Sequence, residues 1–295
     1  WKFEECHWPS LHEWNKQYIR ELSGFAGWTI YSTGCIIART QGVAILLNRF
    51  LGTTINAAYG IALQVTGAIQ FVSASILNAI NPQIMKAEGC GDRQRMIMLA
   101  EYASKYAFLL LSMVAIPLIA EMDTILHLWL GDVPEYATMF CQFILVAALC
   151  DQLTIGLTSA NQAIGQIGNY SLIFYSIKLL TLVGAWICLR KQLPIESVMW
   201  CYVIIEFLSA LIRLPLLYKM ADISILHFCK HVLGRTIVPL VSMVLVAFAI
   251  TMSITNTYRF FLTIITTLVV GGITIWFTAL EKAEKQLVLN YIHHK

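Results

Sequence analysis

The sequence has little charge for its length and no stretch that resembles a soluble domain. Of its 295 residues, 13% are charged and 58% are hydrophobic. Soluble domains carry about twice that charged fraction, so the composition is that of a polytopic membrane protein. The net charge of +3 is small and gives no indication of nucleic-acid binding.

Signatures of catalysis and cofactor binding are also missing. The eight cysteines form no CxxC pair, and most lie in or beside apolar stretches, where cysteine behaves as a small hydrophobe. There is no Walker loop, no glycine-rich nucleotide fingerprint, no GxSxG and no HExxH. His227 and His231 flank Cys229 at a metal-ligand spacing, but basic neighbours favour a solvated helix. We therefore expect no catalytic residue, no metal and no cofactor.

The chain begins at Trp1, not at methionine, and carries no cleavable signal pattern. We expect it to be the downstream part of a longer polypeptide. Residues 1–23 mix tryptophans with Lys2, Lys16, Arg20 and several glutamates, a composition typical of a segment at a membrane interface.

Apolar runs long enough to cross a bilayer, which takes about 20 residues, recur eight times. The predicted spans are 24–47, 56–80, 104–127, 136–160, 170–189, 197–217, 236–254 and 260–280. Short connections predict antiparallel neighbours. Pro117 and Pro239 fall within spans, where kinks are tolerated, whereas Pro82, Pro134 and Pro194 fall at predicted span ends.

Lysine and arginine are distributed unevenly between the two sets of flanks. Thirteen lie on the flanks that include both termini, and only Arg49, Arg190, Lys191 and Arg259 lie on the opposite flanks. The positive-inside rule therefore predicts that both termini are cytoplasmic. It also places the acidic loop from Glu121 to Glu135 outside.

Once the span flanks and the acidic loop are set aside, five charged residues remain within the predicted spans: Arg39, Asp151, Lys178, Glu206 and Arg213. Asp151 lies nine residues and Lys178 eight residues from the inner ends of consecutive spans, so both share one depth and an ion pair is predicted. Glu206 is placed to extend this charge cluster. Arg213 lies close to an inner end of its span, so we expect its side chain to snorkel toward the water. The pair could serve only to fix the register of the two helices, or it could bind a substrate, and both interpretations stay open.

Arg39 lies in the first span, and the neighbouring second span offers it no acidic partner. A lone charge within a span normally faces a bundle interior or a water-filled cavity. Small residues in the second span would let the two helices approach closely. We therefore expect a polar-lined hairpin over 24–89 in which Arg39 binds a substrate. A carboxylate that neutralises Arg39 would overturn this interpretation, because it depends on an unpaired guanidinium.

Four motifs then resemble a known family: NRFLGTTINAAYGIALQV, AINPQIMKAEGCGD, LHLWLGDVPEYA and SANQAIGQIGNYSL. Over residues 22–280 the chain resembles the polysaccharide-transporter branch of the multidrug/oligosaccharidyl-lipid/polysaccharide exporter superfamily, which includes the O-antigen flippases. The resemblance implies the C-terminal lobe of a MATE-type, all-α fold plus two extra helices, with the N-terminal lobe missing. The implied divisions are 1–23 (interfacial segment), 24–217 (six-helix transport lobe), 218–235 (cytoplasmic loop), 236–280 (two additional helices) and 281–295 (cytoplasmic tail).

The implied function is flipping of an undecaprenyl-pyrophosphate-linked oligosaccharide across the bacterial inner membrane, for polysaccharide and lipopolysaccharide O-antigen biosynthesis. Arg39 matches a first-span arginine of this branch and would bind the pyrophosphate, with Gln41 beside it in sequence. Lys178 is a second candidate, and Asn48 and Gln64 would contact the glycan. The implied partners are the lipid-linked oligosaccharide, the missing N-terminal lobe, membrane lipids and glycan-assembly proteins.

One turn departs from the family pattern. Relatives often carry a basic residue near the turn at 161–169, whereas here it is uncharged and rich in amides, with Asn161, Gln162, Gln166 and Asn169. We interpret it as a helix–helix connection.

Other functions stay open. A cation-coupled MATE-type drug or metabolite antiporter would bind its coupling ion with Asp151 or Glu206. A membrane glycosyltransferase or polymerase would need acids or histidines in a sizeable outer loop. The loop at 121–135 offers carboxylates, but it is short and its one histidine is His127. A non-transporting scaffold in a glycan-assembly complex is a third alternative.

Overall fold

The computed structural model describes residues 16–221, 224–254, 258–281 and 284–286. These residues contain no strand, and seven of their helices are long and apolar enough to cross a membrane. The number is eight if the bent pair formed by α5 and α6 is one span. The prediction of an all-α, multi-pass membrane protein is confirmed at this level. Residues 1–15 of the predicted interfacial segment, and most of the predicted tail at 281–295, lie outside the described residues.

The helices follow one another with short connections. In chain order they are α1 (Lys16–Leu51), α2 (Thr53–Gly89), α3 (Arg93–Ala120), α4 (Met122–Leu130), α5 (Ala137–Gln152), α6 (Ile155–Ile164), α7 (Ile167–Arg190), α8 (Ile195–Ala221), α9 (Ile225–Phe228), the π-helical turn η2 (Cys229–Leu233), α10 (Gly234–Ser253), α11 (Arg259–Thr274) and the π-helical turn η3 (Ile275–Ala279).

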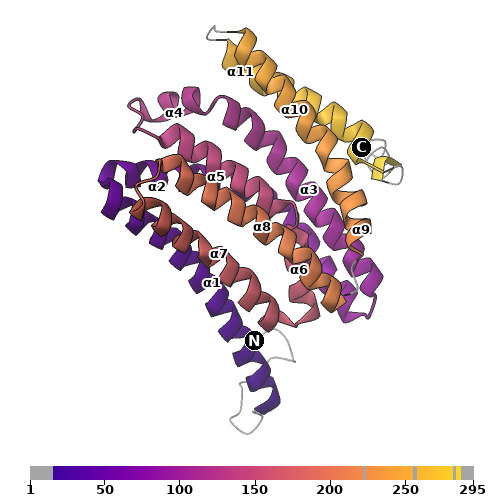
Figure 1. Cartoon of the computed structure of the whole chain (residues 1–295). Coiled ribbons are helices and arrows are strands. Elements are labelled where there is room, and N and C mark those ends of the chain that lie inside the picture. Colours follow the sequence, from indigo (N-terminus) through magenta and orange to yellow (C-terminus); the bar gives the residue numbers. More distant parts are fainter. Residues whose placement is uncertain (1–15, 222–223, 255–257, 282–283, 287–295) are drawn as a thin grey trace, which may run out of the picture.

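Spatial order differs from chain order (Figure 1). At one edge α1 lies along α7, which lies along α8, and α8 packs on α5 in the middle of the bundle. Helix α2 packs on both α3 and α5, and the α10–α11 pair lies against α3 at the opposite edge. The first helix of the chain therefore has its main neighbour more than a hundred residues away. This arrangement decides which intramembrane charges can meet.

Several helices extend beyond the predicted spans. The third span was expected at 104–127, but α3 begins at Arg93, where the side chain of Asp92 accepts a hydrogen bond from the N–H of Arg95 (3.1 Å). Helix α2 continues past Pro82 to Gly89, so this proline does not end a helix. The polar residues that flank the apolar runs simply continue each helix beyond the hydrocarbon-length segment. Likewise, much of the predicted loop at 218–235 is helical.

The acidic segment at 121–135 is not a simple solvated loop. It contains α4, and Glu121 at its start is buried. The Glu121 carboxylate accepts hydrogen bonds from Arg259 Nε (3.0 Å) and the Thr263 hydroxyl (2.9 Å), both on α11. This charged contact joins α11 to the bundle, because a buried carboxylate needs its cationic partner.

A second buried ion pair joins the segment after η3 to α3. Lys105 Nζ lies 2.6 Å from Glu284 Oε1, and both side chains are buried. Burial by itself raises the pKa of the Glu284 carboxyl, but hydrogen bonds from Lys105 and from the backbone N–H of Glu281 outweigh it and hold the pKa below its ordinary value. The pair therefore stabilises the structure fully only while the carboxyl is ionised.

A pH dependence follows from this lowered pKa. Stability from Glu284 is fully present above the carboxyl's unfolded pKa of about 4.3 and is lost as the pH falls through the lower folded value. We expect Glu284→Gln to lower the melting temperature at pH 7, and to show a smaller further loss than the wild type between pH 5 and pH 3. Thermal unfolding of the purified protein in detergent measures this difference. Equal acid sensitivity of the two proteins would contradict it.

Candidate functional site

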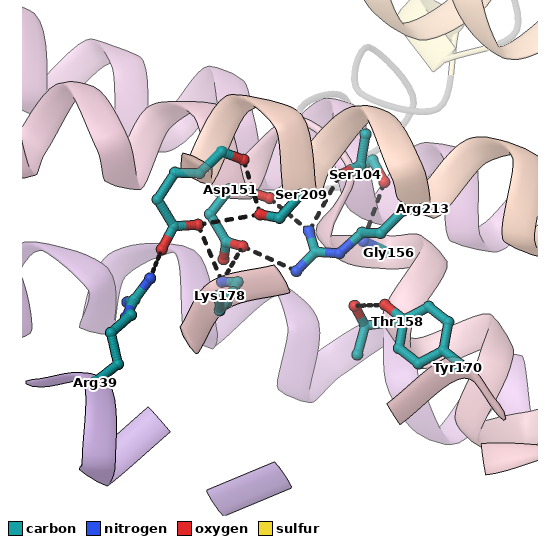
Figure 2. Close-up of polar contacts among 11 residues, drawn as sticks. Arg39, Ser104, Asp151, Gly156, Thr158, Tyr170, Lys178, Ser209 and Arg213 are labelled. Carbon is teal, nitrogen blue, oxygen red and sulfur yellow. Dashed lines mark hydrogen bonds and ion pairs between the residues drawn. The ribbon is translucent and has the colours of Figure 1, made fainter. Parts of the chain in front are cut away.

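The five charged residues predicted within spans meet in one network, the charge cluster (Figure 2). Lys178 Nζ lies 2.9 Å from Asp151 Oδ1 and 3.0 Å from Glu206 Oε2. Arg213 donates to Asp151 Oδ1 at 2.8 Å, and Arg39 forms an ion pair with Glu206. The predicted Asp151–Lys178 pair is confirmed, and so is the extension of the cluster to Glu206.

Signs alternate along this cluster, with a cation at each end. Arg39 contacts Glu206, Glu206 contacts Lys178, Lys178 contacts Asp151, and Asp151 contacts Arg213. Three cations and two carboxylates leave an excess of one positive charge (3 − 2 = +1). An uncompensated charge is costly in a membrane interior. The cluster is therefore electrostatically suited to an anion.

Four helices supply the cluster. Arg39 comes from α1, Asp151 from α5 and Lys178 from α7, whereas Glu206 and Arg213 both come from α8. Seven residues separate this last pair, which is two helical turns, so both side chains project from one face of α8. Helix α8 packs on both α5 and α7, and its acidic and basic side chains bridge the other three helices.

The break between α5 and α6 belongs to the site. The two helices are bent by 45° within the single span predicted at 136–160. Arg213 NH1 donates to the backbone carbonyl of Asp151 (2.8 Å) and to Thr154 Oγ1 (3.1 Å). Backbone groups freed by a break within the membrane must find other partners, and Arg213 is the partner of the Asp151 carbonyl. The prediction that Arg213 snorkels is therefore wrong, because the residue is only 2% exposed.

The expectation that Arg39 lacks an acidic partner is also wrong. Its partner is Glu206, 167 residues further along the chain, and the guanidinium also lies over the Tyr202 ring, 4.7 Å from the ring centroid. The neighbouring span α2 offers Arg39 no acid, whereas α1 packs along α7 and Arg39 reaches past it to Glu206 of α8. A substrate role for Arg39 thus cannot rest on an unpaired guanidinium.

A cavity of about 280 Å³ opens beside the cluster. Arg39, Lys178, Asp151 and Glu206 all line it. Its neutral polar lining comes from Thr40, Thr66, Gln70 and Tyr202. Charged and hydrogen-bonding groups thus converge on one space within the bundle, as in a site for a polar ligand.

Three predicted glycan or phosphate contacts lie elsewhere. Gln41, Asn48 and Gln64 are exposed, and the structure does not bring them to this cavity. Thr66 and Gln70 of α2 line it instead, and their spacing of four residues places them on one helix face. That spacing is the sequence signal that could have identified Thr66 and Gln70.

His227 and His231 each lie against a carboxylate. His227 Nδ1 lies 3.1 Å from Glu101 Oε1, and His231 Nδ1 lies 3.2 Å from Glu281 Oε1. Among the residues that the structure describes, no group of three or more His, Cys, Asp or Glu side chains could hold a metal ion.

Comparison of the chain with protein-family models, with curated proteins and with solved structures found no match.

Proposed function

We propose that this chain is part of a flippase for an anionic lipid-linked oligosaccharide, and that its charge cluster binds the pyrophosphate during transfer between leaflets. The observation that carries the proposal is the positive charge left over in the buried cluster, beside a polar cavity. Phosphate groups suit such a site because arginine and lysine bind them through charge-assisted hydrogen bonds. The resemblance in motifs supplies the substrate class, the bacterial inner membrane, the cytoplasmic termini and a further N-terminal lobe.

The shared position of Glu206 suggests how an anion could bind without leaving a carboxylate unpaired. Glu206 contacts Arg39 through one oxygen and Lys178 through the other, at 3.0 Å. A phosphate that binds Arg39 in place of Glu206 would free only one of the two Glu206 carboxylate oxygens, because Lys178 still contacts the other. The ion pair of Arg39 then acts as a resting state that the substrate replaces, and rocking of one lobe against another would complete the transfer.

A cation-coupled antiporter remains the second candidate, because both carboxylates, Asp151 and Glu206, line the cavity. Each carboxylate already has two cationic partners, however. A coupling cation would have to enter a cluster with an excess of positive charge, which the Coulomb interaction opposes. The charge count therefore favours the anionic substrate. A membrane enzyme gains no support from the outer segment, whose first acid is held by α11.

A charge series tests whether Arg39 binds substrate or merely neutralises Glu206. In a bacterial strain that lacks its O-antigen flippase, we expect the full-length protein to restore surface polysaccharide and Arg39→Ala to fail. The double variant Arg39→Ala/Glu206→Gln keeps the excess charge at +1 but lacks the guanidinium. We expect it to fail as well, with surface glycan reduced by about tenfold or more, the loss that corresponds to one charge-assisted hydrogen bond.

The matched control is Arg190→Ala, which removes an exposed arginine at the end of α7 and should leave glycan unchanged. Quantification of each variant in the membrane fraction separates loss of function from loss of insertion. Normal glycan with the double variant would show that Arg39 only neutralises Glu206. Uptake or efflux driven by an ion gradient and abolished by Asp151→Asn, with surface glycan intact, would favour the antiporter.

A further inference from the structure

A second polar cavity, of about 170 Å³, lies next to the charge cluster between α1, α6 and α7. Ile36 of α1 lines both this cavity and the cluster cavity. Among the described residues, those that line the second cavity carry no charge. Its polar lining includes Thr29, Ser32, Thr33, Thr158, Asn161 and Ser171.

Asn161 carries the clearest sign that this cavity holds a ligand. The residue is 1% exposed, and its Oδ1 has no hydrogen-bond partner among the described residues. Buried polar atoms almost always have a partner, and leaving one without a partner is costly. Asn161 lines the cavity, and a hydrogen-bond donor bound there would supply the partner that this acceptor lacks.

Two hydroxyls of α1 in the cavity lining donate to backbone carbonyls. Thr29 donates its hydroxyl hydrogen to the carbonyl of Phe25 (2.9 Å), and Ser32 donates to the carbonyl of Trp28 (2.7 Å). A hydroxyl that has given its one hydrogen keeps lone pairs for accepting. The cavity is thus neutral and lined by hydroxyls and by the side-chain amides of Asn161 and Gln162, which both accept and donate, and this matches an uncharged ligand with several hydroxyl groups.

Aromatic rings form the remaining wall. Tyr170 and Tyr175 line the cavity, and the Tyr170 hydroxyl lies 3.0 Å from Thr158 Oγ1 (Figure 2). The Tyr170 ring is also stacked on Phe174, with ring centroids 5.4 Å apart, so its position is set by packing. Apolar or aromatic walls combined with a few placed polar groups are typical of small-molecule sites. A sugar ring offers the matching surfaces, with C–H groups on its faces and hydroxyls at its edge.

We propose that this cavity is a binding site for a sugar ring, with Asn161 Oδ1 as the acceptor that fixes its orientation. The proposal rests on the proposed function for the identity of the sugar as part of the transported glycan. Ser32 and Arg39 are seven residues apart on α1, which is about 10 Å along the helix. A pyrophosphate at Arg39 and a sugar of the same molecule beside Ser32 could therefore bind together.

Binding of neutral monosaccharides tests the site directly. The probes are glucose, galactose, mannose and N-acetylglucosamine, measured by saturation-transfer NMR on the purified full-length protein in detergent. We expect at least one to bind saturably, and Asn161→Leu to weaken that binding by about tenfold, the effect of losing one buried hydrogen bond. Thr158→Val, which removes a hydroxyl at nearly constant volume, gives a second variant should Asn161→Leu fail to fold.

Asn169→Leu is the matched control, because Asn169 is exposed and lies outside the cavity. Unchanged affinity in both cavity variants, or no saturable binding of any probe, would overturn the proposal and leave a water-filled cavity. Failure of the flippase proposal can be distinguished from failure of the sugar site. Sugar binding that depends on Asn161 in a protein that moves no lipid-linked glycan would sustain the site without the function. If the protein transfers glycan but Asn161→Leu leaves sugar binding unaltered, the flippase function is sustained and the sugar site is not.

Discussion

Replacing Asp151 with alanine is expected to destabilise the protein by about 3–5 kcal/mol, the cost of removing one partner from a buried ion pair. Asp151 is the carboxylate that Lys178 and Arg213 share, at 2.9 and 2.8 Å. Its loss leaves three cations against one carboxylate, so the excess charge rises from +1 to +2 (3 − 1). The melting temperature in detergent should fall by roughly 10 °C or more.

Two variants identify the source of that loss. Asp132→Ala removes an exposed aspartate and should change the melting temperature little. The double variant Asp151→Asn/Lys178→Met returns the excess charge to +1 and should recover part of the stability lost in Asp151→Asn. If Asp151→Ala melts within a degree or two of wild type, the cluster is hydrated and its ion pairs contribute little.

Replacing Gly156 with alanine is expected to have the second large effect. A Cβ at this position of α6 would lie 2.0 Å from the backbone carbonyl oxygen of Ala100 and 2.8 Å from Ser104 Oγ, both on α3. The N–H of Gly156 also donates to Ser104 Oγ at 3.0 Å. Backbone atoms cannot rotate away as a flexible side chain can, so α3 and α6 must separate. We expect a loss of about 1–3 kcal/mol or more, typical of overpacking.

Separation of α3 and α6 should also disturb the charge cluster. Asp151 and Thr154 lie only a few residues before Gly156, and both accept hydrogen bonds from Arg213. Surface glycan in the complementation assay should therefore fall together with the melting temperature. Gly60→Ala is the control, since no described atom lies within 4 Å of a Cβ built there. This second glycine lies within α2, where alanine is favoured by about 0.5–1 kcal/mol. Equal melting temperatures for the two variants would show that α3 and α6 can adjust without cost.

The sequence was sufficient to predict those structural features whose physical cause is local. Runs of about 20 apolar residues cross a bilayer as helices because lipid offers no partner for an unsatisfied backbone group. The Asp151–Lys178 pair could also be predicted, because the two residues lie at one depth on consecutive spans. Helix ends were less predictable, as at Arg93 and Pro82, since polar residues beyond the membrane segment continue the helices.

What the sequence by itself determined, then, is an all-helical membrane chain with a few charges kept inside it. Only the tertiary structure decided how those charges pair. Arg39 contacts Glu206, and Arg213 binds the carbonyl of Asp151, because α8 lies between elements that are far apart in sequence. The physical reason is that the partner of a buried charge depends on helix adjacency and rotation, which follow from the packing of the whole bundle and not from neighbouring residues.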